Sequence, residues 1–206
     1  MAHWIRSDTA RTALLALATF VAIGATTAGA QHIARGGAAV SPPPEARQFD
    51  FLIGHWELTV TPKASGLGQR IHGAPKLVGT WKAWRAFDGW GIEDELRIMD
   101  ASGNPASLSH ALRLYSAAEK QWSQTLLDVY RAKFTTSRAV WDAKAMTTTA
   151  DGTSPEGKPT KVRSQFTAIT ANAFRWQQDV SDDGGRTWED GTLKIEAKRV
   201  AATAPR

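Results

Sequence analysis

Between about residues 49 and 200, apolar and polar side chains alternate at every second position, and a helical period is almost absent. The clearest apolar sets are Trp56/Leu58/Val60, Val162/Phe166/Ala168, Phe174/Trp176/Val180 and Leu193/Ile195/Ala197. A period of two is typical of strands that place one face in a core and the other in water. Clusters of Gly, Asp, Asn and Pro separate the runs, as expected of turns. This pattern restricts the domain to an all-β fold.

The runs predict ten strands. They lie at about 54–61, 76–87, 91–99, 107–115, 121–131, 133–141, 144–150, 161–170, 173–181 and 187–199. Because no segment between them is predicted to form a helix long enough for a crossover, neighbouring strands should run antiparallel. A meander of this size closes into a barrel or folds into a sandwich, since open sheet edges promote aggregation. We predict an antiparallel up-and-down β-barrel.

The first thirty residues have the pattern of a secretory signal peptide. Arg6 and Arg11 precede an uncharged apolar run at 13–24, and Ala28-Gly29-Ala30 is typical of a cleavage site. An uncleaved membrane anchor is the alternative, but the run is barely long enough to span a bilayer and is rich in Ala and Thr. We predict a secreted or periplasmic protein that has no stable membrane span after cleavage.

The chain is therefore divided into four parts. They are a signal peptide at 1–30, a flexible linker at 31–47, a β-barrel domain at 48–200 and a disordered tail at 201–206. The linker contains a Gly pair and three consecutive prolines, which do not build a packed element.

Composition excludes several classes of protein. The chain has no cysteine, which rules out disulfides, thiolate zinc sites and iron–sulfur clusters. A formal net charge of +5 without a Lys/Arg run gives no sign of nucleic-acid binding. The sequence also lacks a G-x-S-x-G elbow, a P-loop and a dinucleotide-binding glycine pattern. The oligomeric state is left open.

Polar residues on an apolar face are candidates for a site. Asp94 and His110 each lie between apolar residues on the predicted inner faces of adjacent strands. A hairpin that pairs Leu96 with Leu108 places Asp94 opposite His110, and the preceding hairpin places Arg85 beside Asp94. This row is a structural salt-bridge network, a contact for the polar end of a ligand, or an acid/base pair.

Residues Phe49-Asp50-Phe51-Leu52-Ile53-Gly54-His55-Trp56 resemble the G-x-W signature of the calycin superfamily, which includes lipocalins, fatty-acid-binding proteins and nitrobindins. The longer F-D-F-L-I-G-x-W form resembles a family of secreted bacterial calycin-like proteins of unknown function. The resemblance implies that Gly54 forms a tight turn and that Trp56 closes the bottom of the barrel. A basic side chain from the last strand, Arg199 or Lys198, would stack on the indole.

The same resemblance implies a barrel that binds a small, often apolar molecule, or a haem in nitrobindins. A nitrobindin-like haem needs a histidine late in the chain, and this chain has none after His110. Of the other candidates, His55 alternates outward and His72 lies in a Gly-rich loop, without the spacing of a metal site. No haem, metal or other cofactor is predicted.

A second motif spans 181–188 and matches the S-x-D-x-G-x-T-W pattern of the Asp-box repeat known from sialidases. Ser181 and Asp183 should accept backbone N–H groups, Gly185 should take a positive φ, and Trp188 should pack beneath the hairpin. One copy cannot make a propeller. We interpret the motif as a structural hairpin.

These patterns together predict a secreted barrel that binds a small hydrophobic or amphipathic molecule, with Arg85, Asp94 and His110 at its polar end. One alternative is a barrel-fold hydrolase or isomerase that uses His110 with Asp94, although binding without catalysis is favoured. A second is an envelope or interaction module whose barrel is filled. An interior cavity would separate the filled barrel from the other two.

Overall fold

The computed structural model describes residues 41–64, 73–154 and 156–201, and these form ten strands and three short 3₁₀ helices. The helices are η1 (Pro44–Arg47), η2 (Asp50–Leu52) and η3 (Phe87–Gly89). The strands are β1 (Gly54–Pro62), β2 (Leu77–Ala86), β3 (Gly91–Asp100), β4 (Pro105–Ser116), β5 (Gln121–Asp128), β6 (Lys133–Trp141), β7 (Met146–Thr153), β8 (Pro159–Thr167), β9 (Ala173–Ser181) and β10 (Glu189–Arg199).

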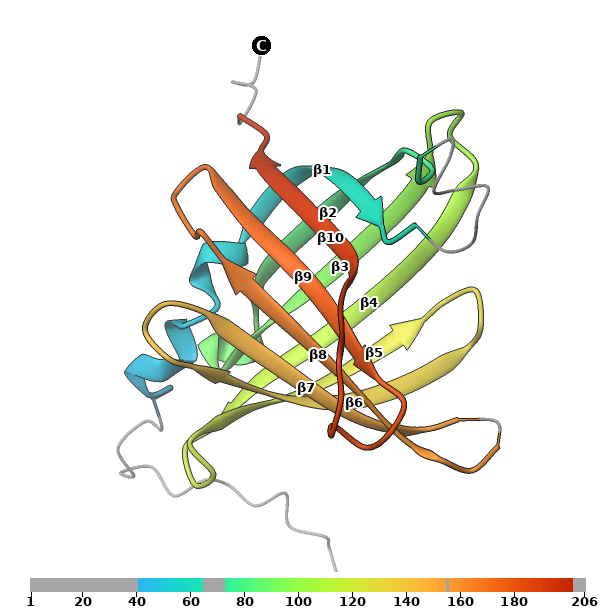
Figure 1. Ribbon diagram of the computed structural model, residues 1–206. Coiled ribbons are helices and arrows are strands. Elements are labelled where there is room, and N and C mark those ends of the chain that lie inside the picture. The colour runs from blue at the N-terminus through green and yellow to red at the C-terminus, as the bar shows by residue number, and fades with distance from the viewer. Residues whose placement is uncertain (1–40, 65–72, 155, 202–206) are drawn as a thin grey trace, which may run out of the picture. The chain divides into compact units, whose positions relative to one another are not determined.

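The strands form a closed antiparallel barrel in which each strand pairs with its neighbours in the chain and β1 pairs with β10 (Figure 1). Closure leaves no sheet edge for another chain to extend. In β1, Trp56, Leu58 and Val60 are buried, while the residues between them are exposed. The apolar side chains at alternate positions therefore face the barrel interior. The predicted ten-stranded up-and-down barrel is confirmed.

Two predicted strands end three residues earlier than expected. The strand predicted at 161–170 stops at Thr167, because Ala168 has a φ of 49° and leaves the extended conformation. The strand predicted at 121–131 stops at Asp128, and a turn follows in which Ala132 has a φ of 49°. Ala168 is consequently a turn residue and not an inward-facing strand residue.

One end of the barrel is covered by the segment that contains η1 and η2, drawn in blue in Figure 1. Phe49 and Leu52 are fully buried there. The Trp122 indole donates a hydrogen bond to Gln48 Oε1 at 3.0 Å. Ala46 is also buried, so the last residues of the predicted linker at 31–47 pack against the barrel. We call this the closed end.

The signal peptide predicted at 1–30 lies outside the described residues, as do His72 and all of the predicted tail except Ala201. No helix in the described part of the chain is both long and apolar enough to cross a bilayer.

A β-bulge sets the register between β3 and β4. Met99 pairs with Pro105, but Ile98, which precedes Met99 in β3, pairs with Ser107. Ala106 is therefore an extra residue on β4. The turn before the bulge is held by Asp100, whose carboxylate accepts the backbone N–H of Asn104 at 2.9 Å. A bulge of this kind moves the rest of the strand by one position.

The consequence is that β4 turns its other face inward. Asp94 pairs with Ala111, and His110 pairs with Glu95. Because a shift of one residue moves every side chain to the opposite face, Asp94 points inward and His110 points outward. If Ala106 were an ordinary strand residue, the Met99–Pro105 register would continue to the predicted pairing of Asp94 with His110. That predicted pairing is wrong.

Candidate functional site

The barrel encloses a cavity of about 310 Å³ above its packed closed end. Its deepest lining residues include Trp81, Phe166 and Trp176, and it extends toward Ile98 and Ser107 at the far end of β3 and β4. This volume is at the low end of the range for small-molecule pockets, which is about 300–1,000 Å³. The cavity is the candidate functional site.

One wall of the cavity is apolar. It comes from strands that lie next to one another around the barrel, β8, β9, β10, β2 and β3, with β1 between β10 and β2. The apolar side chains there are Val162, Phe166, Trp176, Leu193, Trp81, Leu96 and Ile98. Trp81 and Trp176 meet with ring centroids 6.5 Å apart in an edge-to-face arrangement. This wall offers aromatic and aliphatic surface to a ligand.

The other wall carries small hydroxyl groups and amides. It is formed by β4 to β8, with one further amide from β9. Its polar side chains are Ser107, Ser109, Gln124, Thr135, Ser137, Thr148, Ser164 and Gln178, and Ala111, Leu126 and Ala150 lie among them. Short side chains at inward positions leave the interior unfilled, which is why a cavity exists at this level.

The floor of the cavity is a buried ion pair between Asp94 in β3 and Arg113 in β4, which are 2% and 5% exposed. Arg113 Nε donates to Asp94 Oδ2 at 2.5 Å, and Nη2 donates to Oδ1 at 3.2 Å. Arg113 Nη1 donates to Gln124 Oε1 at 2.5 Å. The Trp81 indole N–H completes the cluster by donating to Asp94 Oδ1 at 2.8 Å.

Two parallel hydrogen bonds of this bidentate kind are stronger than a single bond between the same charges. The guanidinium also lies over the Phe49 ring, with Cζ 5.1 Å from the centroid, which connects the floor to the aromatic packing below. Because the two charges cancel, the deep end of the cavity is polar and uncharged overall. Such a floor can orient a polar group without requiring a charged ligand.

His110 lies on the outer surface of the barrel, away from the cavity. Its Nε2 is 3.3 Å from Glu93 Oε2, and its ring centroid is 5.8 Å from that of Trp84. Among the described residues that line the cavity, none is a histidine. An acid/base pair between His110 and Asp94 is therefore excluded by the strand register.

Arg85 shares the inner face with Asp94 but lies nearer the closed end. The η3 turn removes Phe87 from the strand, with a φ of 53°, so the hairpin pairs Arg85 with Ile92 and places Ala83 opposite Asp94. Arg85 Nη1 donates to Ala46 O at 2.9 Å, and its guanidinium forms an ion pair with Asp50. Arg85 anchors the N-terminal segment. The predicted row of Arg85, Asp94 and His110 does not form.

Gly54 and Trp56 lie at the closed end. The Trp56 indole donates to Leu52 O at 2.7 Å, and Arg199 Cζ lies 4.0 Å from the Trp56 ring centroid. Arg199 Nη1 also donates to Ile53 O at 2.7 Å. Gly54 has a φ of 125°, and a Cβ there would lie 2.3 Å from Arg199 Nη1. Only glycine fits this turn.

The hairpin between β9 and β10 is organised by Asp183 and Ser181. Asp183 Oδ1 accepts the backbone N–H groups of Thr187 and Arg186, each at 2.9 Å, and these bonds lower the pKa of its carboxyl. Ser181 Oγ accepts the N–H of Gly185 at 2.7 Å. Gly185 has a φ of 96°. All of these contacts are within the hairpin, so the motif acts locally.

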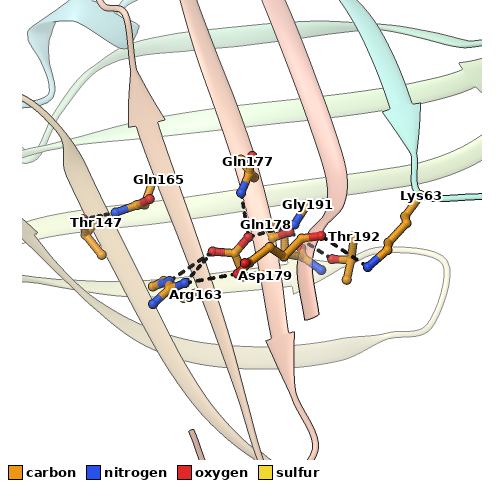
Figure 2. Close-up of polar contacts among 10 residues, drawn as sticks. Lys63, Thr147, Arg163, Gln165, Gln177, Gln178, Asp179, Gly191 and Thr192 are labelled. Carbon is orange, nitrogen blue, oxygen red and sulfur yellow. Dashed lines mark hydrogen bonds and ion pairs between the residues drawn. The ribbon is translucent and has the colours of Figure 1, made fainter. Parts of the chain in front are cut away.

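Trp188 completes that hairpin from the outside of the barrel. Arg163 of β8 stacks on its ring, with Cζ 4.3 Å from the centroid. Arg163 also donates twice to Asp179 Oδ2, from Nε at 3.0 Å and from Nη2 at 2.9 Å (Figure 2). The indole is thereby held between the hairpin and β8.

Asp179 is a second buried carboxylate, on the outer face of the barrel. Its Oδ1 accepts the backbone N–H of Gly191 at 2.9 Å and the Gln177 amide at 2.8 Å (Figure 2). Burial is the largest influence on its pKa and raises it, but the bonds from Gly191, Gln177 and Arg163 together hold the pKa below its ordinary value. Both carboxylate oxygens are engaged by the chain itself, so this cluster fixes the bulge in β10.

The floor and the hydroxyl wall contain residues that the sequence patterns did not identify, chiefly Arg113, Gln124 and Ser164. Strand β4 is misleading because its outward set, which includes Leu108 and Leu112, is more apolar than its inward set. One signal was available. Arg113 is the only Lys or Arg in the β4 sequence, and a buried Asp94 needs a cation.

Among the described residues, no three His, Asp or Glu side chains are grouped so that they could hold a metal ion. No protein-family model matches the chain. No curated protein matches it either. A solved structure described as "Structure of EF1p2_mFAP2b bound to DFHBI" is similar, with a TM-score of 0.39 and 14% identity over 75% of this chain and 98% of that chain.

Proposed function

We propose that the protein binds a small amphipathic molecule inside the barrel. The observation that carries this proposal is the cavity of about 310 Å³ between an apolar wall and a hydroxyl wall. A barrel that serves only as a structural module would fill this level with large side chains. Here the inward positions of β4 hold Ser107, Ser109 and Ala111 instead.

The volume limits the ligand. A water molecule occupies about 30 Å³ in the liquid, so the cavity corresponds to roughly ten water volumes. A compact molecule of roughly ten to fifteen non-hydrogen atoms suits it better than a long acyl chain. Its apolar part would contact Leu96, Trp176 and Leu193, and its polar part would face the hydroxyl and amide groups of the other wall.

Native mass spectrometry of the purified protein tests the proposal directly. We expect an additional small-molecule mass on the native ion that disappears on denaturation. Ala111→Phe places a ring in the cavity and should remove this mass. Leu114→Phe is the matched control, because Leu114 lies on the outer face of the same strand and is 39% exposed.

Retention of the same mass by Ala111→Phe would place the ligand elsewhere. If the native ion carries no added mass, the purified protein is dialysed against 2-naphthol, which fits the cavity. Absence of both a co-purified mass and 2-naphthol binding would contradict the proposal. The thermal midpoint of each variant checks that the barrel remains folded, because overpacking of this kind costs about 1–3 kcal/mol.

We also propose that the protein acts outside the cytoplasm, on the basis of the signal-peptide pattern at 1–30. Expression of the full chain in a bacterial host, followed by fractionation and intact mass measurement, tests this. We expect a chain that begins at Gln31 in the periplasmic or secreted fraction. A chain of full mass in the cytoplasm, or one retained in the membrane, would contradict cleavage and release.

A further inference from the structure

Several cavity hydroxyls lack partners in the protein. Ser109 and Ser164 are 8% and 9% exposed, and neither side chain makes a hydrogen bond within the described residues. The same holds in the described part of the chain for Ser137 and for the Gln178 amide. By contrast, the Ser181 hydroxyl, which is also buried, donates to Asp183 and accepts from Gly185. The oxygens of the cavity groups are not among the buried side-chain atoms without a hydrogen-bond partner, so they are open to the cavity and can pair with a group inside it.

The strand register arranges most of the polar lining groups in two rows, while Ser109 lies outside both rows and pairs with Leu96 and Asp128. Thr148, Ser164 and Gln178 are directly paired positions on β7, β8 and β9. Arg113, Gln124 and Ser137 are paired positions on β4, β5 and β6. The Gln124 amide reaches Thr148 Oγ1 at 3.5 Å and so connects the two rows. The hydroxyl wall is thus a band of donors and acceptors across six strands. On β8 and β9 it adjoins the apolar wall, because Ser164 lies between Val162 and Phe166 and Gln178 pairs with Leu193.

The charges in the cavity favour an uncharged ligand. Arg113 is already engaged by both oxygens of Asp94, so an anion would find no free counter-charge at the floor. The other ionised lining group, Asp128, is itself negative and forms an ion pair with Arg131 at 2.6 Å. Transfer of an unpaired charge from water into such a site is costly. Hydroxyl and amide groups can instead serve neutral donors and acceptors.

We propose that the ligand is an uncharged, largely apolar molecule that carries one or two hydroxyl, carbonyl or amide groups, and that Ser109, Ser164 and Gln178 form hydrogen bonds with these groups. This inference rests on the proposed function and adds the chemical class of the ligand. The apolar part of the ligand lies against Trp176, Leu96 and Leu193. Recognition of a carboxylate by Arg113 is the competing arrangement.

Three rigid probes of nearly equal size distinguish these arrangements: naphthalene, 2-naphthol and 2-naphthoate. Their dissociation constants are measured by equilibrium dialysis at pH 7 with the purified protein. We expect 2-naphthol to bind about tenfold more tightly than naphthalene, as one or two net hydrogen bonds would give. We expect 2-naphthoate to bind at least about tenfold more weakly than 2-naphthol, because its charge is not compensated.

The variant Ser109→Ala/Ser164→Ala should lower the affinity for 2-naphthol about fivefold or more and leave the affinity for naphthalene within about twofold. Ser123→Ala is the matched control, because Ser123 is exposed on the outer face of β5. Gln178→Leu should act in the same direction as the double serine variant. Circular dichroism and the thermal midpoint verify that each variant is folded.

Tightest binding of 2-naphthoate would overturn the inference and establish an anion site. Equal binding of naphthalene and 2-naphthol, unchanged by the serine variants, would also overturn the inference. It would show that the serine hydroxyls form no hydrogen bond with the ligand. In both cases the proposed function survives if Ala111→Phe abolishes binding. If none of the probes binds and no small molecule co-purifies, both proposals fail.

Discussion

The two ends of the barrel interior use the same strand geometry with side chains of different size. At the closed end, Phe49, Trp56, Trp122, Phe166 and Phe174 are fully or almost fully buried. Phe49 meets Trp122 edge-to-face with ring centroids 4.8 Å apart, and Trp56 meets Phe174 at the same distance. Large aromatic rings fill the barrel there, whereas the cavity above has serines and threonines beside its aromatic and aliphatic lining residues.

This difference assigns stability to the closed end of the barrel and ligand binding to the cavity end. Because the chain has no cysteine, stability must come from the closed ladder of hydrogen bonds and from the packed end. The cavity end gives up apolar burial, which costs stability, and its open hydroxyl groups provide a binding surface. The Asp94–Arg113 pair lies between the two levels. Substitutions should therefore affect stability at the closed end and ligand affinity at the cavity end.

Removal of the cation at the cavity floor should have the largest effect. Arg113→Leu leaves Asp94 buried without a counter-charge, and we expect the free energy of unfolding to fall by about 3–5 kcal/mol. Asp94→Leu/Arg113→Leu removes both charges and should recover most of this loss. Urea denaturation at pH 7 measures both variants. A loss below about 1 kcal/mol for the single variant would show that the carboxylate does not depend on Arg113.

This ion pair also marks the limit of what the sequence could predict. Alternation and turn residues were sufficient for the ten strands, because both are local properties of the chain. The inward position of Asp94 was predicted correctly, since β3 has an apolar face of its own. Register depends on one extra residue beside a turn, and no local pattern distinguishes Ala106 from an ordinary strand residue. The faces of β4 were therefore exchanged, so that His110 was placed at the site and Arg113 was missed.

Phe49→Ala and Ser137→Ala compare the two ends directly. Truncation of a buried phenylalanine leaves a cavity in the packed end and should cost about 3–5 kcal/mol. Ser137 faces space that is already hollow, so its truncation should change the free energy of unfolding by about 0.5 kcal/mol or less. Both values are measured by urea denaturation. Similar losses for the two variants would contradict the division between a stabilising end and a binding end.

Gly54→Ala tests the turn at the closed end with a smaller change. A Cβ at φ 125° is strained and would displace the Arg199 guanidinium from Ile53 O and from the Trp56 ring. We expect a loss of about 1–3 kcal/mol in the free energy of unfolding, with no change in the affinity for 2-naphthol. A fall in ligand affinity at constant fold would mean that the two ends are coupled.

The smallest effect is expected for Asp179, on the outer face of β9, and appears in the loss of stability at acidic pH. The pKa of Asp179 is lower in the folded protein than the ordinary value of about 3.9 for an unfolded chain. The stabilisation is therefore present above about pH 3.9 and is lost as the pH falls through the folded pKa. Asp179→Asn should lower stability at pH 7 and flatten the dependence of the unfolding free energy on pH below about pH 4, as followed by urea denaturation at a series of pH values. Parallel curves for the variant and the wild type would show that the bonds from Gly191 and Arg163 do not favour the ionised carboxylate.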